Sequence, residues 1–147
     1  MQKKLSLFKD LFQPFENIAL LHINNKVDFL TPVLEEVATS FNGSCDTKVF
    51  KDESSARLRA TARDYEYIIL SDILSHCQNK DKIIKLMYKA LENSANIIIL
   101  EKISHNNVDE IKELLDKASF VAINHIDLFD EYVIITAKKL HMWGNGL

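Results

Sequence analysis

Two apolar runs, the first broken only by Glu66, and a helix-like segment between them constrain the fold of this chain more than any other feature. The first run covers residues 65–70, the second covers residues 97–100, and apolar residues recur at helical spacing over residues 83–91 between them. Continuous apolar runs are typical of strands buried on both faces, and a helix between two such strands makes a βαβ unit. Because this connection is a right-handed crossover, the sequence predicts two parallel, central strands in a sheet covered by helices.

The composition is that of one ordinary globular domain, with 147 residues, 47% of them hydrophobic and 27% charged. A formal net charge of -3 gives no reason to expect nucleic acid as a partner. No apolar run approaches the roughly 20 residues that span a bilayer, and Lys9 and Asp10 interrupt any signal-peptide core. The cysteines, Cys45 and Cys77, form no CxxC motif and are expected to be reduced. We therefore expect a single cytoplasmic domain over residues 1–147, without a membrane or nucleic-acid partner.

Glycine is scarce, and this scarcity limits the kinds of ligand loop that the chain can form. Of the 3 glycines, Gly144 and Gly146 lie near the end of the chain, so Gly43 alone serves the body. In the segment Phe41-Asn42-Gly43-Ser44, the glycine is expected to cap the end of a helix. No glycine-rich phosphate-binding loop, of either the Walker or the dinucleotide type, can be drawn.

The remaining segments predict further helices and strands in alternation. Apolar residues at helical spacing predict an N-terminal helix within residues 1–15, which either packs on the domain's own sheet or binds a partner. Further helices are expected at 29–41, 54–63 and 106–118, and further strands at 17–23, 47–50, 120–126 and 132–137. Because no helix joins the last two strands, they are expected to be antiparallel. The predicted fold class is three-layer α/β, with a mostly parallel sheet of about six strands and one antiparallel edge strand.

The C-terminal tail, residues 138–147, is expected to be irregular, and it contains the only tryptophan, Trp143. An exposed aromatic side chain in such a tail can anchor a partner. The alternative is that Trp143 folds back onto its own subunit or onto a twin subunit.

Four short segments carry further information through their order and spacing. Residues 65–76 read aromatic, acid, apolar strand, then Ser-Asp-Ile-Leu-Ser-His; residues 85–101 lead from a helix into the next strand; residues 114–120 read LLDKASF; and Asp52-Glu53-Ser54 follows a predicted strand. From about Asn17 to Lys138 the chain resembles the class I S-adenosylmethionine (SAM)-dependent methyltransferases. The resemblance implies a Rossmann-like fold and a SAM site in which the Asp52 carboxylate would hold the cofactor ribose.

The chain departs from this family where the family places glycines and its third strand. A Cβ in the family's GxGxG loop would occupy space that the cofactor needs. The positions that match family glycines hold His22, Asn24 and Lys26 in the first loop, and Ser94, Ala95 and Ser119 later. Arg63 leads almost directly into Tyr65, where the family inserts a third strand and the residues that clamp adenine. Either the glycines drifted as dispensable residues or the cofactor function was lost, and the missing strand favours loss.

Polar side chains follow the predicted strands at the points where the strands end. Open α/β sheets bind ligands in the crevice at the carboxyl ends of their strands, near the switch in strand order. The residues expected at this mouth are His22, Asn24, Asn25, Asp52, Ser71, Asp72 and Glu101. The first five of these are the candidate cofactor-binding residues. For His22 the alternative is a surface residue at a strand end.

Asp72 and His76 are the candidate catalytic residues. Their i, i+4 spacing puts them on one face of a helical turn, and a carboxylate that orients an imidazole makes a general base. The alternative is that Asp72 caps the turn while His76 packs against the sheet edge. No third ligand is apparent near either residue, so no metal site is expected. A basic cluster, Arg57, Arg59 and Arg63, either meets phosphate or forms a solvated face.

Two functions follow from these observations. The first, which we favour, is a non-catalytic binding or assembly module without a cofactor, acting as a homodimer or with a protein partner through the N-terminal helix or the Trp143 tail. The second is an active SAM-dependent methyltransferase of unknown substrate. Binding of SAM distinguishes the two.

Overall fold

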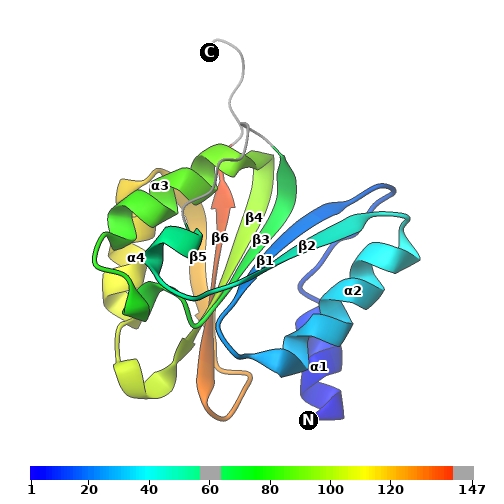
Figure 1. Ribbon diagram of the computed structural model, residues 1–147, viewed down its shortest axis with the longest axis horizontal. Coiled ribbons are helices and arrows are strands. Elements are labelled where there is room, and N and C mark those ends of the chain that lie inside the picture. Colours follow the sequence, from blue (N-terminus) through cyan, green and yellow to red (C-terminus); the bar gives the residue numbers. More distant parts are fainter. Residues whose placement is uncertain (57–63, 141–147) are drawn as a thin grey trace.

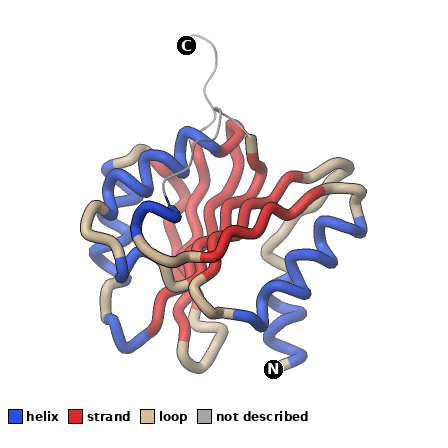
Figure 2. The backbone as a smooth tube through the Cα atoms, in the orientation of Figure 1, coloured by secondary structure: helices blue, strands red, loops and turns tan. Residues whose placement is uncertain are grey.

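The computed structural model of the chain describes residues 1–56 and 64–140 as one mixed sheet with helices on both faces. The helices are α1 (Gln2–Lys9), α2 (Thr31–Ser40), α3 (Lys80–Ala90) and α4 (Val108–Lys117). The strands are β1 (Ala19–Asn24), β2 (Ser44–Val49), β3 (Tyr65–Ser71), β4 (Leu91–Lys102), β5 (Phe120–Ile126) and β6 (Tyr132–Lys139). Helices α1 and α2 cover one face of the sheet, and α3 and α4 cover the other (Figure 1). The path of the chain through these three layers can be followed in Figure 2.

The strand order is β2-β1-β3-β4-β6-β5, in which β3 and β4 are the predicted central, parallel pair. Strands β1 to β4 are parallel, whereas β6 is antiparallel to both of its neighbours, β4 and β5. The predicted six-stranded, mostly parallel sheet is confirmed, and the single antiparallel strand lies one place in from the β5 edge. The order switches between β1 and β3, so their carboxyl ends border the crevice in which such sheets bind ligands.

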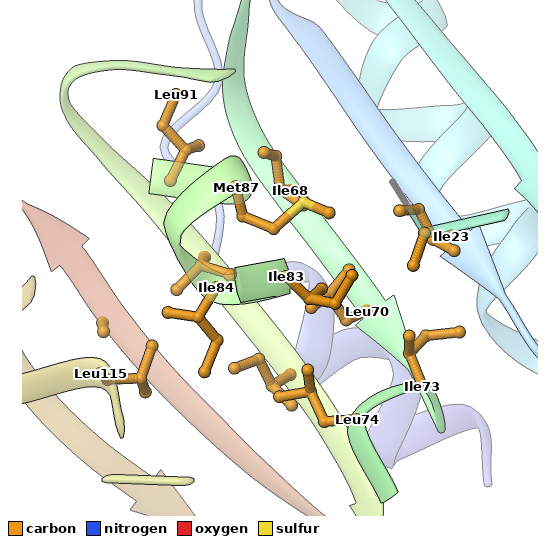
Figure 3. Close-up of a cluster of buried hydrophobic side chains, with 14 of the residues drawn as sticks. Ile23, Ile68, Leu70, Ile73, Leu74, Ile83, Ile84, Met87, Leu91 and Leu115 are labelled. Atoms are coloured by element: carbon orange, nitrogen blue, oxygen red, sulfur yellow. The ribbon is translucent and has the colours of Figure 1, made fainter. Parts of the chain in front are cut away.

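Each face of the sheet carries its own hydrophobic core. Along β4 the side chains alternate between the faces: Ile97 and Ile99 join the cluster under α3 and α4, and Ile98 joins the cluster under α1 and α2. Figure 3 shows the first cluster, in which Ile83, Ile84 and Met87 of α3 pack over Ile68 and Leu70 of β3. Burial on both faces explains why these strands read as apolar runs.

The N-terminal helix is shorter than predicted, because α1 ends at Lys9. Pro14 disfavours the helical conformation for the residue before it, and the apolar pattern continues past the helix in a segment that is not helical. Phe8 and Phe12 are buried, and the Phe12 ring lies 4.7 Å from the Tyr67 ring, centroid to centroid. Phe15, the last residue of the predicted helix, is 51% exposed. The segment therefore packs on the chain's own sheet.

Gly43 follows the end of α2 as predicted, but the reason for a glycine differs from the expectation. The left-handed residue of this turn is Asn42, with φ of 54°, while the Gly43 N–H donates to the Ala38 carbonyl at 2.8 Å. A Cβ on Gly43 would lie 2.1 Å from the Ile18 carbonyl oxygen. Close approach to the segment before β1, rather than a positive φ, therefore requires the glycine.

The irregular tail is predicted to begin at residue 138, but strand β6 continues through Lys139, so the tail begins later than predicted. The Lys139 side chain is nearly buried, its ammonium donates to the Leu91 carbonyl at 2.8 Å, and it lies 4.8 Å from the centroid of the Tyr88 ring. A lysine stem can cover apolar surface while its head group finds polar partners, and the sequence pattern does not show this. The rest of the tail, with Trp143, lies outside the described residues.

The helix predicted at 54–63 is a 3-10 turn, Glu53–Ala56, in its described part. Arg57, Arg59 and Arg63 lie outside the described residues. Cys45 and Cys77 do not form a disulfide with each other. Within residues 1–56 and 64–140, no helix has the length and apolar character needed to cross a membrane.

Candidate functional site

A polar crevice of about 890 Å³ opens at the carboxyl ends of the parallel strands, at the lower end of the sheet in Figure 1. Of the residues predicted at this mouth, Asn25, Asp52 and Asp72 line it, together with His76. The lining residues that the sequence did not predict as site residues include Lys26, Lys51, Glu53, Lys102 and Tyr132. The position of the crevice follows from the topology, and its walls are more charged than apolar.

His22 and Ser71 lie on the neighbouring strands β1 and β3 and are both fully buried. The His22 Nε2 atom is 2.8 Å from the Ser71 hydroxyl, and its Nδ1 atom has no hydrogen-bond partner among the described residues. Burial lowers the pKa of His22 to about 4, so the imidazole is neutral at physiological pH. The alternative of a surface histidine is wrong, and neither side chain lines the crevice.

The loop after β1 uses its polar groups to hold itself together. The Asn24 side-chain oxygen accepts the Val27 N–H at 2.9 Å, and the Asn25 N–H donates to the Ser71 carbonyl at 3.0 Å. The Asn25 side chain donates to the Asp72 carbonyl at 3.0 Å, which ties this loop to the one after β3. Lys26 has φ of 61°, in the left-handed region that favours glycine, and it lines the crevice.

Asp52 stands at the rim of the crevice and caps its own 3-10 turn. Its carboxylate accepts the Ser54 N–H at 3.1 Å, the Ser54 hydroxyl at 2.5 Å and the Ser55 hydroxyl at 3.5 Å. The hydrogen bond from the Ser54 side chain is the main reason that the pKa of Asp52 is lowered. Asp52 is therefore in the predicted position, and one of its two carboxylate oxygens, Oδ1, is engaged within its own turn.

The predicted pairing of Asp72 with His76 is present. Asp72 is nearly buried, with φ of 60°, and its Oδ2 atom lies 3.3 Å from His76 Nε2. The Ser75 hydroxyl donates to the other carboxylate oxygen at 3.4 Å, within the turn formed by Leu74–His76. Because His76 is about half exposed and faces the crevice, this pair has the geometry for proton transfer.

Glu101 and His105 form a second pair of the same kind beside the first. Glu101 is fully buried at the end of β4, and its Oε1 atom accepts the Asn107 side-chain N–H at 2.9 Å and lies 3.7 Å from His105 Nδ1. Its Oε2 atom has no hydrogen-bond partner in the described part of the chain. Burial raises the pKa of Glu101, and the negative charge of Asp72 raises it further.

The sheet register brings the two pairs together. The Asp72 N–H donates to the Leu100 carbonyl at 2.9 Å, so the residues at the ends of β3 and β4 lie side by side. Possible ligand atoms of Asp72, Glu101 and His105 all lie within 4.8 Å of one another. No metal site is expected from the sequence because no third ligand lies near Asp72 along the chain, but in the fold Glu101 and His105 lie near it. A signal existed, since acid-x-x-x-His occurs at the end of both central strands, as Asp72-Ile-Leu-Ser-His76 and Glu101-Lys-Ile-Ser-His105.

No family model and no curated protein sequence matches the chain, whereas solved structures do. A SAM-dependent methyltransferase from Aquifex aeolicus is similar over 93% of this chain and 89% of its own, with a TM-score of 0.75 and 10% identity. Phosphoethanolamine N-methyltransferase 2 from Haemonchus contortus, in complex with SAM, is similar over 95% of this chain but 53% of its own, with a TM-score of 0.71 and 11% identity. A putative methyltransferase from Bacillus halodurans is similar over 92% of this chain and 98% of its own, with a TM-score of 0.67 and 9% identity. The chain therefore has the class I, Rossmann-like methyltransferase fold.

Proposed function

We propose that this chain is a non-catalytic binding module built on the methyltransferase fold, with a crevice that does not hold SAM in the family's usual pose. The observation that carries the proposal is the loop after β1, where the resemblance expects glycines and the backbone must approach the cofactor closely. Side chains at Asn24 and Lys26 stand there instead, and Asn24 and Asn25 bond the loop to itself and to the end of β3. Opening this loop for a ligand would break those bonds.

The charge of Lys26 supports the same proposal. The sulfonium of SAM is cationic, and Lys26 stands in the loop after β1 where the resemblance expects a glycine, although the crevice as a whole is lined by three lysines and by the carboxylates of Asp52, Glu53 and Asp72. Two like charges 4 Å apart repel by about 1 kcal/mol in water, and by more where water is excluded. The Asp52 carboxylate, which would hold the ribose, already accepts hydrogen bonds from Ser54 and Ser55 through Oδ1. Repulsion by Lys26 weakens SAM binding.

An active SAM-dependent methyltransferase is the second candidate. The fold is retained, the crevice lies at the switch in strand order, and Asp52 still stands at its rim. The Asp72–His76 pair would then serve as the general base.

Calorimetry with SAM and with S-adenosylhomocysteine distinguishes the candidates. We expect no binding of either compound at micromolar concentrations of the protein. A dissociation constant of about 10 μM or tighter, which corresponds to roughly -6.8 kcal/mol, would contradict the proposal. If heat is observed, the variant Asp52→Ala serves as the control, because binding in the usual pose should weaken in this variant while its melting temperature changes little.

A binding module needs a partner, and we propose a second copy of the chain. In the described part of the chain β2 pairs with β1 alone, and an unpaired strand edge can accept another strand. The N-terminal segment and the Trp143 tail are the other contact surfaces that the sequence suggested. Light scattering on the eluting protein measures the mass directly, and a strictly monomeric chain at tens of micromolar would rule out this partner.

A further inference from the structure

The two acid-x-x-x-His segments at the crevice form a cluster with the composition of a metal site. The first segment follows β3 and the second begins in the last residues of β4; each ends in a 3-10 turn, Leu74–His76 and Ile103–His105. We propose that Asp72, Glu101 and His105 together bind one divalent transition-metal ion. His76, whose Nε2 atom is 3.3 Å from the Asp72 carboxylate, lies beside this cluster but is not one of the three residues whose ligand atoms come together.

Two buried carboxylates lie close together at the centre of the cluster. Asp72 and Glu101 are both nearly or fully buried, and their carboxylates approach within 4.8 Å. Two buried like charges are unfavourable unless a cation or a proton lies between them. The Glu101 Oε2 atom is buried and has no hydrogen-bond partner among the described residues, although its neighbour Oε1 is well bonded. An unsatisfied buried carboxylate oxygen is uncommon unless something binds to it.

The mixture of imidazole and carboxylate ligands indicates which metal the cluster would bind. Mg²⁺ and Ca²⁺ prefer ligand sets made of oxygen alone, whereas imidazole nitrogen together with carboxylate oxygen suits Zn²⁺ and its first-row neighbours. The His76 and His105 rings are 6.0 Å apart, centroid to centroid, and each one has a nitrogen near a carboxylate of the pair. The set therefore favours Zn²⁺, Co²⁺ or Mn²⁺.

Neighbouring side chains donate hydrogen bonds to the two proposed ligand carboxylates. The Asn107 side chain donates to Glu101 Oε1, and the Ser75 hydroxyl donates to Asp72 Oδ1 at 3.4 Å. Such outer hydrogen bonds hold ligand carboxylates in position in metal sites. Since Asp72 and His76 line the crevice, an ion would be reached from solvent. The inference does not depend on whether the chain binds SAM.

The competing explanation is that a proton between the two carboxylates, rather than a metal ion, relieves their repulsion. Lys102 and Tyr132 line the same crevice as Asp72 and His76. The experiment must therefore detect the metal itself.

The test is to strip the full chain with a chelator and titrate it with Zn²⁺ by calorimetry and with Co²⁺ by visible absorption near pH 7. We expect saturable binding of one ion per chain. Loss of a residue that only hydrogen-bonds to a metal ligand weakens metal affinity by about 10–100-fold. Because Glu101 and His105 would be ligands themselves, Glu101→Gln and His105→Gln should each weaken metal binding by at least that factor. The matched control is His125→Gln, which removes an exposed histidine of β5 and should bind as the unaltered chain does.

Absence of binding to the stripped chain would overturn the proposal. Binding that survives both Glu101→Gln and His105→Gln would also overturn it, because the ion would then lie elsewhere. Should Glu101→Gln fail to fold, His105→Gln decides alone, since the His105 side chain is 30% exposed and its loss leaves the core intact. Titration of SAM is measured separately, so failure of either proposal is recognised independently.

Discussion

The buried imidazole of His22 should make the protein lose stability as the pH falls below about 6.5. In the folded chain burial lowers the pKa of His22 from 6.5 to about 4, so between these values the unfolded chain binds the extra proton and the folded chain does not. Stability therefore rises with pH across this window and falls as the pH is lowered through it.

The magnitude follows from the two pKa values. A shift from 6.5 to about 4 corresponds to roughly 3 kcal/mol when the whole window is crossed. About 2 kcal/mol of this should be lost between pH 7 and pH 5, because the unfolded histidine is almost fully protonated at pH 5 while the folded one is still neutral.

The perturbation is the double variant His22→Leu with Ser71→Ala, which removes both partners of the buried hydrogen bond. Replacing both partners by apolar groups of similar shape is often nearly neutral, whereas removing one leaves the other unsatisfied. Urea unfolding at pH 7 and pH 5 should show that the variant loses about 2 kcal/mol less than the unaltered chain. Other titrating groups, including Glu101, are common to both proteins and cancel in this difference.

The matched control is His125→Leu on the exposed side of β5, which should keep the full acid loss. If the double variant loses as much stability as the unaltered chain between pH 7 and pH 5, then His22 does not stay neutral in the fold. The argument from burial would then be refuted.

Two further predictions concern the core and the turn before β2. Ile98→Ala should cost about 2–5 kcal/mol in the free energy of unfolding, because Ile98 is 1% exposed on a central strand. The control Val49→Ala, at a residue 68% exposed, should cost under about 0.5 kcal/mol. Equal losses for the two variants in urea unfolding would contradict the assigned core. Gly43→Ala should cost about 1–3 kcal/mol because its Cβ would meet the Ile18 carbonyl, whereas Ser44→Ala next to it, at an exposed side chain, should be nearly neutral. A thermal melt of Gly43→Ala that matches the unaltered chain would show that the close approach is not required.

Local patterns in the sequence predict the central βαβ unit, the antiparallel closing pair and the position of the crevice. The apolar runs 65–70 and 97–100 identify strands covered on both faces, and this requirement leaves few arrangements for the rest of the chain. Because ligand crevices in such sheets lie at the carboxyl ends of the strands, Asn25, Asp52 and Asp72 could be assigned to the mouth before the fold was known.

The tertiary structure decided which of these side chains are accessible and which meet one another. His22 lies on a strand with both faces covered, so no alternation marked it as buried. Asp72 and Glu101 are far apart in the sequence, and they become neighbours through the register of β3 on β4, in which Ser71 pairs with Leu100. Gly43 is needed because of Ile18, a contact between segments that no local pattern describes. Periodicity reports how each segment is buried, but a site made of several loops depends on pairing between strands, and only the folded sheet sets that pairing.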